Sequence, residues 1–439
     1  MFPYWSSKRA ASDLDRLAST TLFRIAIAGL LTCLHLLVFR YAGQDRLELP
    51  FNSAPNEAPY YSDPDASSIR GIPRQPHHWS RLIVSRWDAQ HYIGFAIRGI
   101  TACPTDGETA TDLQYLECGL AWLPAYGVVG GAVSDVTGMP ADITLFMMSI
   151  LAALIVNLLW TSRAIVERLG RLETYATLVA FNIFPTAFYL VTPYTESATL
   201  ALVLAGFVLL MRDRWVLAGL FVGAATALRA TAVGFAAGLA TAAAIAAYRR
   251  RKSGDPKWWR PALAIPLAGW GQLVQLLVLK IVVGDAKAYL RAREAFGDER
   301  HYTRLFDPEW YVQGFTAQHM DSVMLLGCIA IVGLTCREVF RRFKLEESIY
   351  LAVSMAVTVM ISIVSVHEYW GLNRYLLLCP LVFIGTGTLV RKHYVVLGLW
   401  LVLCAAIYWH VELCSYIAQG DSRICPCLGR IEYWFPFRS

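Results

Sequence analysis

Residues 141–160 read ADITLFMMSILAALIVNLLW, an apolar run whose charged side chain is Asp142. A helix needs about 20 such residues to cross the hydrocarbon core of a bilayer. The chain has 439 residues, 56% of them hydrophobic and 16% charged, whereas soluble domains have about 45–50% apolar and about 25% charged residues. The apolar excess is gathered into runs of this kind. The sequence therefore predicts an all-α polytopic membrane protein.

Other apolar runs of comparable length predict the rest of a transmembrane bundle. Residues 215–248 are too long for one helix and predict two short helices bent near Arg229. The first run lacks a small-residue cleavage site, which favours a retained helix over a removed signal peptide. The whole chain, 1–439, is thus predicted to be one membrane domain of about 11 helices. The remaining expected spans are 20–41, 174–193, 195–211, 262–283, 322–337, 346–366, 375–390 and 393–413.

The lysines and arginines predict which loops lie outside. Six basic clusters share one side of the membrane if residues 117–137 do not cross, and the positive-inside rule makes that side the cytoplasm. We therefore expect 117–137 to be interfacial or re-entrant, as its glycines and proline also suggest. The outer segments are then a first loop with amphipathic helices, 42–140, a second loop, 284–320, and a tail, 415–439. The clusters are Lys8/Arg9, Arg163/Arg168/Arg171, Arg212/Arg214, Arg249–Lys252, Arg337/Arg341/Arg342/Lys344 and Arg391/Lys392.

Charge and cysteine usage limit the partners. The formal net charge of +6 is explained by cytoplasmic loops, and no stretch predicts nucleic-acid binding; membrane lipid is the expected surrounding. Cys103 and Cys118 lie in the first outer loop, where an oxidising compartment permits the disulfide that we expect between them. No four ligands have zinc-site spacing, and Asp63-Pro-Asp65 predicts a turn rather than a metal-binding pair. We expect neither metal nor cofactor.

The first outer loop contains Arg86-Trp-Asp-Ala-Gln-His-Tyr92, which begins a short amphipathic helix. Asp88 and His91 are three residues apart and project from one side of such a helix. One interpretation is a capping aspartate with a solvent-facing histidine. The other is a carboxylate base beside an imidazole at headgroup depth, where an acceptor hydroxyl could reach a lipid-linked donor.

Three further charged residues are expected at the same outer surface. Glu196 follows a span broken by Pro185 and ended by Pro193; it either caps the next helix or binds sugar hydroxyls. Arg229, in an apolar stretch, either extends to the interface or binds a lipid phosphate through its guanidinium. Arg374 opens an outer helix end and allows the same phosphate-binding interpretation.

Four blocks of this sequence resemble the GPI mannosyltransferase II (PIG-V-like) family of the GT-C glycosyltransferase superfamily. They are RWDAQHYIGFAIRG, GLAWLPAYG, FNIFPTAFYLVTPYTES and ALRATAVGF, within about residues 80–235. Two blocks depart from the family pattern. Ala125 and Gly127 replace Gly and Pro, and Ala230-Thr231-Ala232 replace Ser-Asn-Gly, the polar residues expected beside the block's arginine.

The resemblance implies a GT-C-type bundle and an inverting, metal-independent hexosyl transfer, with mannose as the expected sugar. The donor would be a polyprenyl-phosphate sugar, and the acceptor a lipid-linked or other glycan. It further implies that Asp88 is the base, that His91 and Glu196 lie in the site, and that Arg229 and Arg374 hold the donor phosphate. Neighbours expected to line the sugar or acceptor are Trp87, Tyr92, Tyr194, His367 and Glu368.

The alanine- and arginine-rich composition and short loops are typical of a bacterial protein. We therefore expect the inner membrane, with the active site facing the exterior; an endoplasmic-reticulum protein with a lumenal site is the alternative. A different class of function, a polytopic transporter or flippase, predicts paired repeats and broken helices that are charged at mid-membrane. A lipid-binding scaffold without catalysis is a third interpretation. A single site around Asp88, Glu196, Arg229 and Arg374 would favour the enzyme, and a two-sided cavity the transporter.

Overall fold

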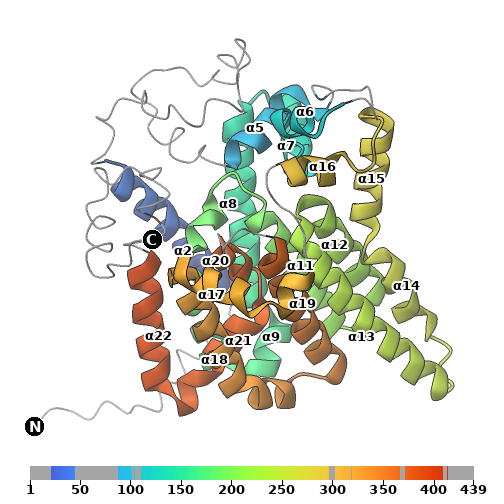
Figure 1. The fold of residues 1–439 in the computed structure, drawn as a ribbon. Helices are drawn as coiled ribbons and strands as arrows, with labels where there is room; N and C mark the ends of the chain where they lie inside the picture. The colour runs from blue at the N-terminus through green and yellow to red at the C-terminus, as the bar shows by residue number, and fades with distance from the viewer. Residues whose placement is uncertain are drawn as a thin grey trace, which may run out of the picture.

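The computed structural model describes residues 21–44, 88–100, 103, 110–295, 302–317, 319–365, 371–408 and 413. Within these ranges every regular element is helical (Figure 1). Six helical stretches are long and apolar enough to cross a membrane: Thr21–Val38, Ala141–Trp160, Ala230–Lys252, Trp259–Val282, Met320–Arg342 and Leu345–Val364. The apolar helices Glu196–Met211, Trp215–Leu228 and Tyr394–Ile407 are shorter. The chain is thus a multi-pass membrane protein by length and composition, and the count of eleven spans stays a prediction.

Several spans are interrupted where the sequence removes helical hydrogen bonds. α10 (Arg171–Asn182) stops before Pro185 and is followed by the short η4 (Ala187–Val191). The predicted continuous span 375–390 is wrong, because α20 (Leu372–Leu377) and α21 (Pro380–Lys392) are separate helices. A proline has no backbone N–H to continue the preceding helix.

The predicted bend near Arg229 is confirmed. α12 (Trp215–Leu228) ends at this residue, whose backbone is extended, with φ −149° and ψ 132°. A short η5 (Ala230–Ala232) then leads into α13 (Val233–Lys252). The break leaves the arginine backbone outside either helix, so its side chain can project sideways into the bundle.

The N-terminal helices show how the chain alternates between the two ends of the bundle. α2 (Thr21–Gln44) begins beside the end of α8 (Ala141–Trp160), because the Arg24 guanidinium donates to Thr161 Oγ1 and the Leu158 carbonyl, each at 3.2 Å. α7 (Ala125–Thr137) is only about 20 Å long at 1.5 Å per residue, and it packs against α5 (Ala89–Arg98) and α8. It therefore adds no passage between α2 and α8.

We call one end of the bundle the basic end, because ion pairs between its charged clusters hold it together. These pairs join α9 (Arg163–Leu169) to α19 (Leu345–Ser365), α13 to α19 and to Asp213 just before α12, and α10 to α18 (His319–Arg342) and α21. They are Arg168–Glu347, Arg249–Glu346, Arg250–Asp213, Arg342–Glu173 and Arg391–Glu173. Five of the six predicted clusters thus meet at one end; Lys8/Arg9 lies outside the described residues.

The opposite end, which we call the loop end, carries short helices at the top of Figure 1. α5, α6 (Asp112–Glu117) and α7 come from the first predicted outer loop, and α16 (Ala288–Ala295) from the second. Arg291 of α16 donates to Asp112 Oδ1 at 2.5 Å and to the Ala110 carbonyl at 2.6 Å. The predicted Cys103–Cys118 disulfide is confirmed. The tail 415–439, with Cys425 and Cys427, lies outside the described residues.

The remaining helices complete the bundle. α11 (Glu196–Met211) runs from the loop end to the basic end, and α14 (Trp259–Leu267) with α15 (Trp270–Val282) leads back to the loop end. α17 (Pro308–Ala317) is held by Trp310, whose indole donates to the Ile363 carbonyl at 3.0 Å. α22 (Tyr394–Ile407) packs against α21. Buried aromatic side chains, among them Trp160, Phe181 and Phe383, fill the core between these helices.

Candidate functional site

Asp88 stands at the start of α5 without capping it. It is the N-cap residue, yet its carboxylate makes no capping hydrogen bond. Its Oδ2 instead accepts from Arg374 Nη1 at 2.8 Å, and the side chain keeps 26% of its surface exposed. The capping interpretation is therefore wrong, and the carboxylate faces a cation from a segment 286 residues away.

Glu196 is the first residue of α11 and is fully buried. Its Oε1 accepts from Arg374 Nε at 2.9 Å and from Nη2 at 2.6 Å, and lies 2.9 Å from Arg229 Nη1. Its Oε2 is buried without a hydrogen-bond partner among the described residues. A carboxylate can occupy such a position only because the two guanidiniums neutralise it. Glu196 thus fixes both arginines through one oxygen and does not reach solvent.

Arg229 lies in the break between α12 and η5, and its side chain is only 11% exposed. Besides Glu196, it donates from Nε to Thr231 Oγ1 and from Nη1 to Thr195 Oγ1, both at 3.2 Å. Its guanidinium also lies 5.2 Å from the centre of the Tyr375 ring. The interpretation in which it extends to the interface is wrong. Thr231 lies in the block that departs from the PIG-V-like pattern, and its hydroxyl supplies one of the polar contacts of Arg229.

Arg374 is the centre of the site. Its guanidinium lies 4.5 Å from the Tyr189 ring centre and 4.9 Å from that of Tyr194. Such faces attract a cation through the ring quadrupole. The backbone of α20 is fixed on either side, because Asn373 N–H donates to Asp321 Oδ1 at 2.9 Å and Thr186 Oγ1 donates to the Asn373 carbonyl at 3.0 Å.

The structure brings together the four charged residues that the sequence predicted at one surface. We call Asp88, Glu196, Arg229 and Arg374 the quartet; it holds two negative and two positive side chains from four separate segments. Burial acts to raise the pKa of the Asp88 carboxyl, but the charge and hydrogen bond of Arg374 outweigh it and hold that pKa below its usual value. Asp88 is therefore ionised at neutral pH.

His91 lies beside Asp88 on α5 and stacks on Trp122. The ring centres are 3.4 Å apart and the planes 11° from parallel. Burial lowers the pKa of His91 to about 4, against the opposing charge of Asp88, so the imidazole is neutral at pH 7. The interpretation of His91 as a solvent-facing residue is wrong. The side chains of His91 and Trp122 are both half-buried.

The other predicted site residues divide into two groups. Tyr92 and Tyr194 are buried, Tyr92 edge-on to Tyr126 and Tyr194 beneath Arg374. In this conformation neither ring is open to a sugar. Trp87, His367 and Glu368 lie outside the described residues.

Sequence reasoning missed Tyr189, although it contacts Arg374. The residue sits in the quoted FNIFPTAFYLVTPYTES stretch, where it looks like one more aromatic residue of a span. Its role depends on Arg374, which comes 185 positions later in the chain. No pattern along the sequence signals that contact.

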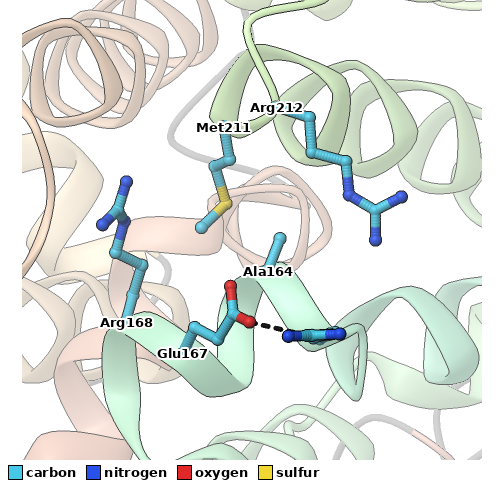
Figure 2. A pocket seen from close by; sticks show the side chains of 6 residues that line it. Ala164, Glu167, Arg168, Met211 and Arg212 are labelled. Atoms are coloured by element: carbon cyan, nitrogen blue, oxygen red, sulfur yellow. Dashed lines mark hydrogen bonds and ion pairs between the residues drawn. The ribbon is translucent and has the colours of Figure 1, made fainter.

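Two hollows open at the basic end, away from the quartet. The smaller, about 370 Å³ and shown in Figure 2, lies between α9 and the end of α11, lined by Arg168, Glu167, Met211 and Arg212. Met211 and Glu196 are the two ends of α11, which places this hollow about 22 Å from the quartet at 1.5 Å per residue. The larger, about 650 Å³, includes Lys344 and Glu347. Neither hollow contains a predicted site residue.

Within the described ranges, no group of three His, Cys, Asp or Glu side chains lies together as metal ligands do. The two acids of the quartet each face an arginine, so the cations that neutralise them are part of the protein. Comparison of the chain with protein-family models, with curated proteins and with solved structures finds no match.

Proposed function

We propose that this protein is a glycosyltransferase that moves a hexose, mannose being the sugar the motifs favour, from a polyprenyl-phosphate donor to a lipid-linked or other glycan acceptor. The observation that carries the proposal is the quartet: a partly exposed carboxylate lies 2.8 Å from an arginine that shares a buried glutamate with a second arginine. A base beside two phosphate-binding groups is what such a transfer requires.

The roles follow from the charges. The acceptor hydroxyl attacks the anomeric carbon while its proton passes to Asp88, and a new C–O bond forms on the face opposite the phosphate. The bond between the anomeric carbon and the phosphate oxygen breaks, and its electron pair leaves with the phosphate. Arg374 and Arg229 stabilise that charge, since planar guanidiniums bind phosphate oxygens bidentately. Configuration at the anomeric carbon is inverted, and the mechanism requires no metal.

The other residues serve binding and positioning. Glu196 is a positioning residue, because it holds both guanidiniums and has no exposed surface. The stacked rings of His91 and Trp122 offer the flat apolar face on which sugar rings commonly pack. Trp87, His367 and Glu368 stay assigned to the sugar or acceptor on the resemblance alone, whereas the buried Tyr92 and Tyr194 support the site from beneath.

The topology supports an active site facing the exterior of a bacterial inner membrane. The quartet lies at the loop end, whereas the described basic clusters meet at the other end, which the positive-inside rule assigns to the cytoplasm. The resemblance to PIG-V-like and other GT-C enzymes agrees with this placement, and the disulfide at the loop end fits an oxidising compartment.

The proposal is tested with purified protein, radiolabelled polyprenyl-phosphate mannose and a lipid extract as acceptor source. We expect label to enter a new glycan or glycolipid, in the presence of EDTA as well as Mg²⁺, with the product identified by mass spectrometry. Asp88→Asn is the negative control. If the protein in vesicles moves the labelled donor across the membrane unchanged and forms no product, the transporter interpretation replaces this one.

A further inference from the structure

All three nitrogens of the Arg374 guanidinium donate to carboxylates of the protein. Nη1 donates to Asp88, and both Nε and Nη2 donate to Glu196. The ring centres of Tyr189 and Tyr194 lie 4.5 and 4.9 Å from the guanidinium carbon and 5.0 Å from each other, so both rings lie on one side of the guanidinium. Three of the five guanidinium N–H groups are thus engaged, and a phosphate gains the Nη1 N–H that Asp88 now holds only if that carboxylate gives way.

The two carboxylates differ in how firmly they are held. Glu196 is fully buried and its Oε1 is shared by Arg374 and Arg229. Among the described residues Asp88 pairs with one arginine; its side chain is 26% exposed, and it is the N-cap residue of the short helix α5. Displacing Glu196 would leave a buried charge without a partner, which is strongly unfavourable. Displacing Asp88 only moves a carboxylate that already reaches the surface.

We infer that the donor phosphate takes the place of Asp88 on Arg374, so that binding of the donor itself frees the base. This inference rests on the proposed function and adds an order of events to it. Before donor binding, Asp88 is neutralised by Arg374 and is a weak base. After binding, Arg374 is neutralised by phosphate and Asp88 is available to the acceptor hydroxyl.

The change in basicity has a direct physical cause. Asp88 faces Arg374 of α20, Arg229 at the α12–η5 break and His91 of α5. Burial favours the neutral acid, and the Arg374 contact is the strongest effect opposing it. When phosphate neutralises Arg374, the charge that held the pKa of Asp88 down is lost, and that pKa rises toward the range of an effective base.

The inference makes an unusual prediction about ligand affinity. If Asp88 competes with phosphate for Arg374, removing its charge should tighten phosphate binding although the residue belongs to the active site. The probe is farnesyl phosphate, a short isoprenyl phosphate without a sugar, titrated into the purified full-length protein in detergent by calorimetry. Farnesol reports binding of the tail alone.

We expect Asp88→Asn and Asp88→Ala each to bind farnesyl phosphate roughly tenfold more tightly than wild type, with farnesol binding unchanged. Asp112→Asn is the matched control, since Asp112 is also an arginine-paired aspartate at the loop end; it should bind as wild type does. Glu196→Gln should bind more weakly, because the arginines lose the group that positions them.

The outcomes separate the inference from the proposed function. Unchanged or weaker binding in both Asp88 variants overturns the inference; if wild type still transfers sugar, the proposed function stands. Tighter binding in Asp112→Asn as well would overturn it too, since the effect would then be general charge. If wild-type protein binds neither farnesyl phosphate nor a polyprenyl-phosphate sugar, the proposed function fails and the inference with it.

Discussion

The two ends of the bundle carry ion-pair networks built on the same plan. At the loop end, Glu196 is fully buried and holds Arg374 and Arg229. At the basic end, Glu173 is fully buried and holds Arg342 and Arg391. In each network at least one arginine is remote from the glutamate in the sequence: Arg374 is 178 residues from Glu196, and Arg342 and Arg391 are 169 and 218 residues from Glu173. We call the second network the clasp; it consists of Glu173, Glu338, Arg342, Arg391 and Lys392.

The networks differ in what surrounds the cations. Arg374 and Arg229 are 18% and 11% exposed and lie against tyrosine rings, whereas in the clasp Arg342 is 20% and Arg391 57% exposed. Each network also contains a second, partly exposed carboxylate, and these two carboxylates are held differently. Glu338 is held by Arg342 one helical turn away and by Lys392, whereas Asp88 depends on one contact from a distant segment. The clasp is a structural tie between helices, and the quartet concentrates cations where a ligand can exchange for a carboxylate.

The largest expected effect is on transfer activity, and it should distinguish the two partly exposed carboxylates, Asp88 and Glu338. Asp88→Asn should lower transfer by about 10²–10⁴-fold, the usual contribution of a general base, because no other carboxylate of the quartet reaches solvent. Its thermal stability should stay close to that of wild type. Glu338→Gln, the matching change in the clasp, should leave turnover within about twofold, since its pairs are surface interactions. Initial rates with labelled donor, normalised to folded protein, measure both; equal losses would erase the distinction.

The two buried glutamates should behave alike in stability and differently in function. Glu196→Gln and Glu173→Gln each leave two arginines facing a neutral amide, and removal of one partner from a buried pair costs about 3–5 kcal/mol. Chemical unfolding in detergent measures this cost. Only Glu196→Gln should also weaken donor binding. If Glu173→Gln weakens donor binding as strongly, then the clasp communicates with the site and is more than a tie.

Among the described residues, only the loop end contains a disulfide. Cys103→Ser with Cys118→Ser opens a loop of 15 residues, for which chain entropy predicts a loss of about 3 kcal/mol. Limited proteolysis should then cut α5–α7 earlier than the helices of the basic end. Cys336→Ser, which removes a free thiol, is the control. If protease cuts the loop end of the double variant no faster than that of wild type, the prediction is contradicted.

The smallest effect concerns pH. His91 has a pKa near 4 in the folded protein and 6.5 in the unfolded chain, so between these values the unfolded state binds more protons. Stability should therefore fall as pH drops from 6.5 toward 4, by about 1–2 kcal/mol, since each unit is worth 1.36 kcal/mol and a partly exposed ring realises only part of it. His91→Gln should flatten this slope in unfolding curves. His393→Gln at the basic end controls for loss of an exposed histidine; a slope unchanged by His91→Gln would count against a half-buried imidazole that is neutral in the folded protein.

Hydropathy and local chemistry along the chain determined much of this protein. Runs of apolar residues specify the long helices, and Pro185 and Arg229 mark breaks that the structure contains. The placement of Cys103 and Cys118 in one outer loop predicted the disulfide that the structure contains. Motif residues identified Asp88, Glu196, Arg229 and Arg374 as candidates. These features could be predicted because each depends on neighbours within a few turns of the chain.

Only the tertiary structure decided which charges pair. A carboxylate or guanidinium in an apolar stretch must find a partner, because an isolated buried charge is too costly; the sequence therefore states that partners exist. It does not say that Arg374 joins Glu196, 178 residues away, to Asp88, 286 residues away. Nor does it say that Tyr189 covers that arginine. These contacts follow from how the broken helices pack, because side chains far apart in the chain meet only when the whole bundle has formed.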